Sequence, residues 1–257
     1  MANYRILAIF AFVGAAFAIS PGVADAQQAI GSTTTAQNQV TREIGGASAA
    51  LATGESVYRN EVVKTGTDSL AKLVFVDSTN LAVGPTSRVV LDRFVYEGDP
   101  SAQKVAVNLA KGVFRFTTGG LDKKAYTINT PTAAIGVRGT VLDIDVRNVQ
   151  TSVTLVEGHA LVCPRRNGVS FEQQARNCGK AFSGSAAGGG RCDCAEIQNP
   201  GETATVKKVG GTNQAGLSST PVNFASLCAG AASLCSSDSS YASNAIGGGS
   251  GGVLCGR

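Results

Sequence analysis

Short runs of β-branched and aromatic residues fill the middle of this 257-residue chain. Between Ser56 and Val162, Gly, Pro, Asp or Asn interrupts these runs about every 8 to 12 residues, which is the spacing of strands in an all-β sandwich or roll. Charged residues make up only 16% of the chain, which argues against coiled coils and most helical bundles. We therefore predict an all-β fold, a compact β-sandwich or β-roll of short, mostly antiparallel strands.

The expected strands are short, and few exceed about eight residues. Asp77 to Asn80, Lys111-Gly112 and Glu157-Gly158 each separate two apolar runs, and each predicts a hairpin loop. The predicted strands are residues 56–64, 71–76, 80–83, 88–96, 104–110, 113–117, 125–129, 133–137, 141–146, 152–156 and 160–163.

Residues 1–26 have the pattern of a cleavable signal peptide. Arg5 supplies the positive start, residues 6–19 are almost wholly apolar, and Ala24-Asp25-Ala26 fits a cleavage site. An uncleaved membrane anchor is the alternative, but this apolar stretch is shorter than the roughly 20 residues of a spanning helix. We expect a mature chain that begins at Gln27, is periplasmic or secreted, and has no stable membrane span.

Composition divides the rest of the chain into a leader, a β domain and a tail. Residues 27–50 are polar and Gly-rich, and we expect a weakly ordered leader with at most one edge strand, around residues 47–51. The β domain spans residues 51–209. Within it, residues 164–191 are rich in Gly, Ser and Ala, which predicts an insertion that caps a hairpin.

The tail, residues 210–257, is rich in Gly and Ser and has one helical candidate, residues 222–235. On a continuous helix Cys228 and Cys235 would lie about 10.5 Å apart along the axis, beyond the roughly 7 Å limit for a disulfide. Cys255 follows a flexible Gly run and can reach either of them. We expect one of these two cysteines to remain the odd thiol.

The chain has seven cysteines, and in an oxidising compartment they predict structural disulfides. The segments that end at Cys163 and begin at Cys192 are expected to be the two arms of a hairpin. Cys163 then faces either Cys192 or Cys194, and Cys178 in the insertion pairs with the other, so the insertion is tied by disulfides. The C-x-C spacing at 192–194 differs from the C-x-x-C of zinc knuckles and redox pairs, so we predict no metal site.

Several ordered motifs occur between residues 56 and 206. They are VVKTGTDSLAKLVFVD at 62–77, LAVGPTS at 81–87, TPTAAIGVRGTVLDI at 130–144, VEG at 156–158 and NPGET at 199–203. In this order they resemble the FecR-type periplasmic domain. The resemblance implies an all-β domain, and its best-known members are the periplasmic half of cell-surface signalling regulators, which relay the state of an outer-membrane receptor to a sigma factor.

Those regulators carry a cytoplasmic anti-sigma segment and a spanning helix before the domain, whereas this sequence shows only a signal peptide. The resemblance therefore implies a periplasmic binding or interaction module that acts with a separate membrane receptor or sensor. The alternative is a structural cell-envelope or surface-attachment protein stabilised by disulfides.

Arg138 lies in a nearly uncharged stretch, so its guanidinium needs a partner. A carboxylate such as Asp143 or Asp92, or strand-end carbonyls, would satisfy it, and unpaired burial would cost several kcal/mol. Arg138 is therefore either a structural residue that pins two strands or a residue that faces a partner. Asp143 and Asp145 are two residues apart, and we expect a solvated face opposite Arg147 or Arg115 rather than a cation site.

The candidate partner-binding residues are Arg138 and the tips of two predicted hairpins, Asp77, Asn80, Glu157 and His159, because loops on a rigid sheet usually carry binding residues. We expect no enzyme and no cofactor. His159 is the only histidine, and the sequence has no nucleophile elbow, phosphate-binding loop or H-E-x-x-H pair. A net charge of +4 is too small and diffuse to indicate nucleic acid as a partner.

Overall fold

The computed structural model describes residues 28–95, 104–120, 126–178 and 192–227. Its elements, in chain order, are β1 (Ala29–Gln37), β2 (Val40–Ile44), β3 (Ala47–Ala50), β4 (Ser56–Tyr58), β5 (Glu61–Thr65), β6 (Leu70–Phe75), β7 (Asn80–Val83), β8 (Arg88–Val95), β9 (Lys104–Thr117), β10 (Tyr126–Asn129), β11 (Ala133–Arg147), β12 (Gln150–Pro164), α1 (Phe171–Arg176), β13 (Ala195–Ile197), β14 (Thr203–Val209), β15 (Thr212–Ser218) and α3 (Phe224–Leu227).

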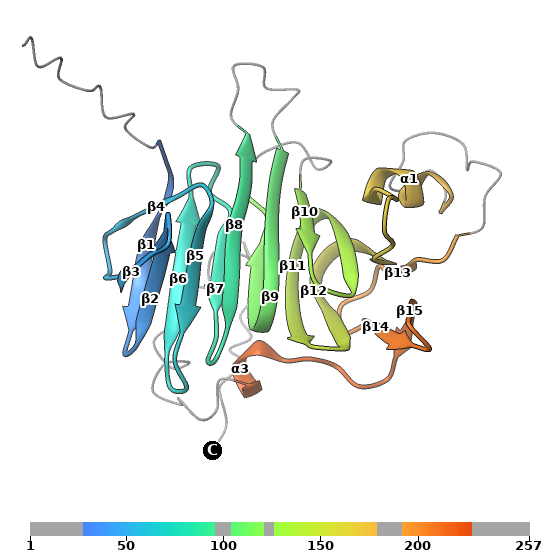
Figure 1. The fold of residues 1–257 in the computed structure, drawn as a ribbon. Helices are drawn as coiled ribbons and strands as arrows, with labels where there is room; N and C mark the ends of the chain where they lie inside the picture. The colour runs from blue at the N-terminus through green and yellow to red at the C-terminus, as the bar shows by residue number, and fades with distance from the viewer. Residues whose placement is uncertain (1–27, 96–103, 121–125, 179–191, 228–257) are drawn as a thin grey trace, which may run out of the picture.

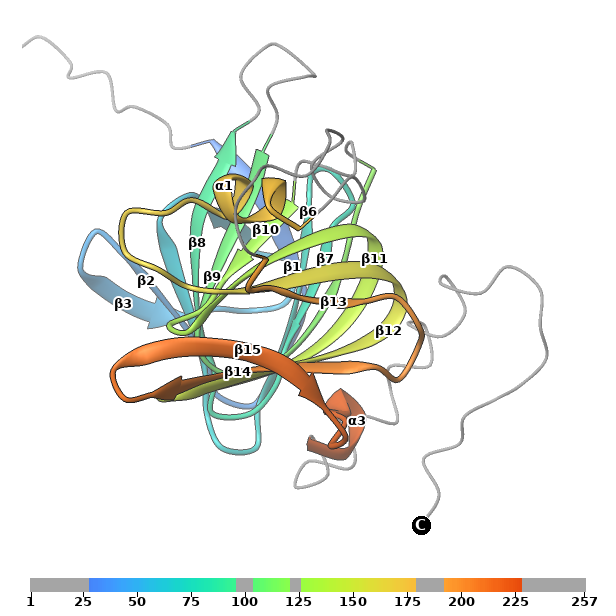
Figure 2. The same ribbon diagram turned by 90° about the vertical axis from the view of Figure 1, so that its right-hand side faces the viewer.

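The strands of the described residues form one continuous sheet. Its main path runs β15-β14-β12-β11-β10-β9-β7-β6-β1-β4, and β2, β3, β5, β8 and β13 join it from the side. Neighbours are antiparallel except β9 and β10, which are parallel. The sheet curls so that its strands surround a common interior (Figures 1 and 2). The all-β roll predicted from the sequence is confirmed.

Alternation along the long strands fills this interior. Phe114 and Phe116 on β9 are buried, as are Leu142 and Ile144 on β11 and Leu155 on β12. In a strand, residues two apart share one face, so the residues between them point away from the core. Two surfaces result, a dry interior and an outer face on which several polar side chains lie.

Two predicted hairpin loops are wrong. Lys111-Gly112 lies inside β9 and Glu157-Gly158 lies inside β12, so β9 has 14 residues and β12 has 15. Gly112 and Gly158 have φ of 112° and 87°, and each bends its strand without ending it. At Gly158 the pairing of β12 with β11 continues past the bend, whereas at Gly112 β9 exchanges β8 for β11 and β7. The turn at residues 77–79 does join β6 to β7, as the sequence predicts.

The residues expected to be a weakly ordered leader are three strands instead. β1 pairs with β4 and β6, and β2 pairs with β3 and β5. Their sequence is polar and small, and Ile30 and Val40 are the large side chains that enter the core from β1 and β2. Backbone pairing with the domain therefore orders a segment whose side chains carry almost no hydrophobic pattern.

The insertion and the tail are also more structured than expected. The insertion contains α1, whose Phe171 packs on the outer face of β11 at Gly136. The predicted tail contributes β15, which pairs with β14 along its whole length. Of the helix expected at 222–235, the described residues contain α3, and Cys228, Cys235, Cys255 and the predicted signal peptide lie outside them.

Among the residues that the structure describes, no helix has the length and apolar character needed to cross a membrane.

Candidate functional site

The site begins where β11 changes its neighbour. Before Arg138, β11 pairs with β10, and from Val141 onward it pairs with β9. β12 remains beside both halves, but the register between the two strands shifts between Arg138 and Val141 and again at Leu142. Both strands bend here, at residues 138–141 of β11 and 157–159 of β12, and we call this place, together with the β6–β7 turn and the end of β9 beside it, the corner.

Hydrogen bonds of Thr140 hold the corner together. Its Oγ1 accepts the Arg138 N–H at 2.9 Å and donates to the His159 carbonyl oxygen at 2.8 Å. The Thr140 N–H donates to Thr118 Oγ1 at 2.9 Å, and the Thr118 N–H donates back to the Thr140 carbonyl at 3.1 Å. One threonine therefore ties β11 to β12 and to the end of β9.

Two glycines allow the strands to approach closely at the corner. Gly139 and Gly158 have φ of 57° and 87°, in the left-handed region that side chains disfavour. A Cβ on Gly158 would lie 2.0 Å from the Gly139 carbonyl oxygen. Glycine is therefore required at position 158 by conformation and by contact with the facing backbone.

Strand register brings the candidate residues of the sequence analysis together at the corner. Asn80 is opposite Thr117, Thr117 is opposite Val141, and Val141 is opposite Glu157. Neighbouring strands are about 4.8 Å apart, so this row of residues spans about 14 Å across β7, β9, β11 and β12. Arg138 and His159 face each other next to the end of this row. Residues that are distant in sequence thus lie close together across four strands of the sheet.

The carboxylate of Asp77 is engaged within the chain. Its Oδ1 accepts the Thr79 N–H at 3.0 Å, and its Oδ2 accepts the Thr79 hydroxyl at 2.6 Å and the Tyr126 hydroxyl at 2.8 Å. The Asn80 side-chain amide donates to the Ser78 carbonyl at 2.9 Å. These two residues shape the turn, and the exposed contact groups come from elsewhere in the corner.

Those exposed groups are both charged and apolar. Glu157 and His159 are exposed and Arg138 is half-buried. Val76, which precedes the turn, is 60% exposed, and Val156, which precedes Glu157, is 40% exposed. A mixed surface on a rigid scaffold is suited to contact with another protein.

Asp143 is paired with Arg115 and not with Arg138. The Arg115 Nε and NH2 groups donate to the two carboxylate oxygens at 2.7 and 2.9 Å. Asp143 is 2% exposed, so the solvated face expected here is wrong for this residue, because Phe224 of the tail covers it. Asp145 is paired with Arg147 at 2.8 Å. The alternation of Asp with apolar residues located the outer face but gave no sign that a distant segment covers it.

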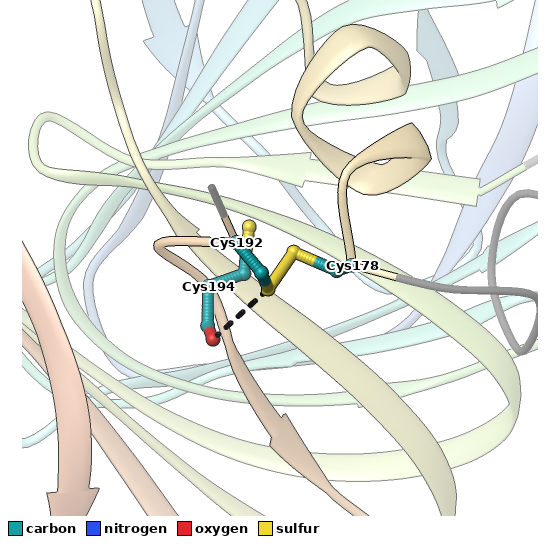
Figure 3. Close-up of side chains that lie close together, drawn as sticks. All are labelled: Cys178, Cys192 and Cys194. Carbon is teal, nitrogen blue, oxygen red and sulfur yellow. Dashed lines mark hydrogen bonds between the residues drawn. A yellow bond between two sulfur atoms is a disulfide. The ribbon is translucent and has the colours of Figure 1, made fainter. Parts of the chain in front are cut away.

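The structure joins Cys163 to Cys194 and Cys178 to Cys192. Ala160 to Val162 pair with residues 197 to 195, so the same register places Cys163 opposite Cys194 and settles which partner it takes. Figure 3 shows Cys192 bonded to Cys178 with Cys194 beside them. The sulfurs of Cys178, Cys192 and Cys194 lie within 4.8 Å of one another, but each belongs to a disulfide and is not a thiolate that could bind a metal.

Comparisons with known proteins agree with the motifs. Residues 61–161 match the family model described as FecR protein. No curated protein matches the chain. Two crystal structures described as "a putative anti-sigma factor" from Parabacteroides distasonis ATCC 8503, at 1.65 and 2.50 Å, are 11% and 10% identical to it, each with a TM-score of 0.40. Each alignment covers 63% of this chain and 60% of the anti-sigma factor structure, so this chain matches less than two thirds of the length of those proteins. The corner, Arg115 and Asp143 all lie inside the residues that match the FecR family model.

Proposed function

We propose that this chain is a non-catalytic binding module that docks a separate membrane receptor or sensor through the corner. The observation that carries the proposal is the row formed by strand register, which aligns Asn80 with Glu157 and ends beside the facing pair Arg138 and His159, within the FecR match. The hydrogen bonds of Thr140 and the close approach at Gly158 hold the corner in one conformation. A preorganised surface loses little entropy when a partner binds.

The two disulfides support a location outside the cytoplasm, because disulfides persist in oxidising compartments. A periplasmic or secreted location agrees with the signal peptide indicated by the sequence. There the module would meet the outer surface of the inner membrane or the inner surface of the outer membrane. The proposed partner is therefore a protein whose receptor or sensor domain is exposed in that compartment.

The proposal is tested by capture from solubilised membranes with the immobilised mature chain, followed by quantitative mass spectrometry. Arg138→Ala is compared with Arg147→Ala, an arginine of the same strand that is 68% exposed and lies at the far end of β11. We expect the captured receptor to fall at least tenfold with Arg138→Ala, at an unchanged melting temperature, and to be unaffected by Arg147→Ala.

If Arg138→Ala lowers the melting temperature, the exposed residues of the corner decide the question. Glu157→Lys reverses a charge and His159→Ala removes a ring, and neither side chain is part of the core. Loss of the captured receptor in either variant supports docking at the corner. The same captured proteins from all three variants would show that the partner binds elsewhere.

A further inference from the structure

A second row of side chains crosses the outer face of the sheet, two residues along the strands from the corner. Register places its members opposite one another on β7, β9, β11, β12 and β14. All but Arg115 are at least 95% buried, although they point away from the core. We call this set the outer row; its members are Ala82, Arg115, Asp143, Thr154 and Thr203.

A short segment of the tail, residues 221–227, contacts the outer row at Arg115, Asp143 and Thr154, and we call this segment the strap. The Val222 N–H donates to Thr154 Oγ1 at 2.7 Å, and the Phe224 N–H donates to Asp143 Oδ2 at 3.0 Å. Two backbone donors, two residues apart in sequence, thus meet acceptors on two adjacent strands. The donors are backbone groups of the strap. Thr154 and Asp143 would therefore accept the same hydrogen bonds from the backbone of another chain.

The ring of Phe224 supplies the side-chain part of the contact. It is 6% exposed, and the Arg115 guanidinium carbon lies 5.7 Å from its centroid, within range of a cation–π interaction. Gly84 lines the other side, where an added Cβ would come within 3.2 Å of the ring edge. The absence of a side chain at Gly84 therefore makes room for an aromatic ring.

The ion pair of the outer row is made within the sheet and does not include the strap. Asp143 keeps its bidentate contact with Arg115, so departure of the strap would expose an ion pair to water and would not leave a buried charge alone. The residues at 219–220 that lead into the strap are exposed. The acceptors lie inside the family match at 61–161, whereas the strap lies outside it. The two acceptors thus belong to the FecR match, and the strap that contacts them does not.

We propose that the outer row is a peptide-recognition site. It accepts a segment whose phenylalanine ring packs beside Arg115 and whose backbone N–H groups, at the phenylalanine and two residues before it, donate to Asp143 and Thr154. Residues 222–224 fill the site within the chain, and a partner protein that presents the same pattern displaces them. The strap is tethered to the domain and acts at an effective concentration of about millimolar. A free competing segment therefore binds more weakly by the ratio of this concentration to the dissociation constant of the strap.

The test uses the full mature chain and a fluorescent peptide with the sequence of residues 219–227, STPVNFASL, measured by anisotropy. The chain carrying Phe224→Ala is expected to bind this peptide at least tenfold more tightly than the unaltered chain, because its own strap has lost its anchor. A peptide with alanine in place of phenylalanine should bind at least tenfold more weakly. A Phe224→Ala chain that is folded by circular dichroism but binds no peptide at millimolar concentration would overturn the proposal.

A matched pair of acidic variants tests the acceptor. In the Phe224→Ala background, Asp143→Asn should weaken peptide binding at least tenfold, whereas Asp145→Asn, two residues away and outside the row, should leave it unchanged. If Asp143→Asn does not fold, Thr154→Val removes the other acceptor. Equal binding by both acidic variants, or by the Thr154 variant, would refute the site. Arg138→Ala should leave peptide binding unchanged, so this result is independent of the proposal for the corner.

Discussion

Replacement of Gly158 by alanine tests the geometry of the corner most directly. An alanine at a φ of 87° costs about 1–2 kcal/mol, because its Cβ crowds the adjacent carbonyl oxygen. The Cβ would also lie 2.0 Å from the Gly139 carbonyl oxygen, a backbone atom that can move only if β11 and β12 separate. Separation loosens the hydrogen bonds around Thr140, each worth about 1 kcal/mol. We expect a total loss of about 3 kcal/mol in the free energy of unfolding.

Gly201→Ala is the matched control. Gly201 has a φ of 89° and no atom within 4 Å of an added Cβ, so it shares the conformational cost and lacks the contact. Urea unfolding followed by circular dichroism should show a loss of about 1–2 kcal/mol for Gly201→Ala, at an unchanged m-value. A loss of about 3 kcal/mol corresponds to a melting temperature about 6–12 °C lower for a domain of this size. Equal losses for the two variants would show that β11 and β12 do not approach closely at the corner.

Two further predictions concern packing and pH. Gly136→Ala should lower the free energy of unfolding by about 1–3 kcal/mol, because its Cβ would lie 2.2 Å from the ring of Phe171. In a Phe171→Ala background this loss should nearly vanish. If urea unfolding shows that the losses of the two substitutions add, the contact between these residues is not present. Burial raises the pKa of Glu61 above 4.5, although the Tyr58 N–H and Arg42 act in the opposite direction. The folded state therefore binds the proton of the Glu61 carboxyl group more tightly than the unfolded state does. The stability that protonated Glu61 contributes is lost as pH rises from about 4.5 through the raised pKa. The free energy of unfolding of the unaltered chain should fall relative to that of Glu61→Gln over this pH range. If the difference between the two free energies does not change with pH, burial does not raise the pKa of Glu61.

The strand pattern predicts the class of fold, but glycine alone does not tell a turn from a bend. Lys111-Gly112 and Glu157-Gly158 look like two-residue loops, because a glycine with positive φ suits both a hairpin and a bulge. The difference lies in what the next residues pair with, and that is a long-range property. The sequence therefore predicts too many short strands where β9, β11 and β12 continue.

The sequence predicts only part of the candidate site, because local turn chemistry can be recognised in a sequence and strand register cannot. Asp77, Asn80, Glu157 and His159 are indicated by local turn chemistry, and their meeting at the corner depends on register. The predicted hairpin limited the partner of Cys163 to Cys192 or Cys194, and the register of β12 and β13 selects Cys194. The strap had no such signal, because Phe224 is one of two aromatic residues, far apart, in a Gly/Ser-rich tail.

The connectivity of the two bridges has a consequence for biosynthesis. The Cys178–Cys192 bridge lies nested inside the span that Cys163 and Cys194 close. A chain made from its N-terminus presents Cys178 to Cys163 first, so oxidation in order of appearance would join the wrong partners. The native pattern requires Cys163 to persist as a thiol until β13 aligns beside β12, or an early bridge to be exchanged by thiol attack. Correct maturation of this protein thus depends on the relative speeds of oxidation and strand pairing.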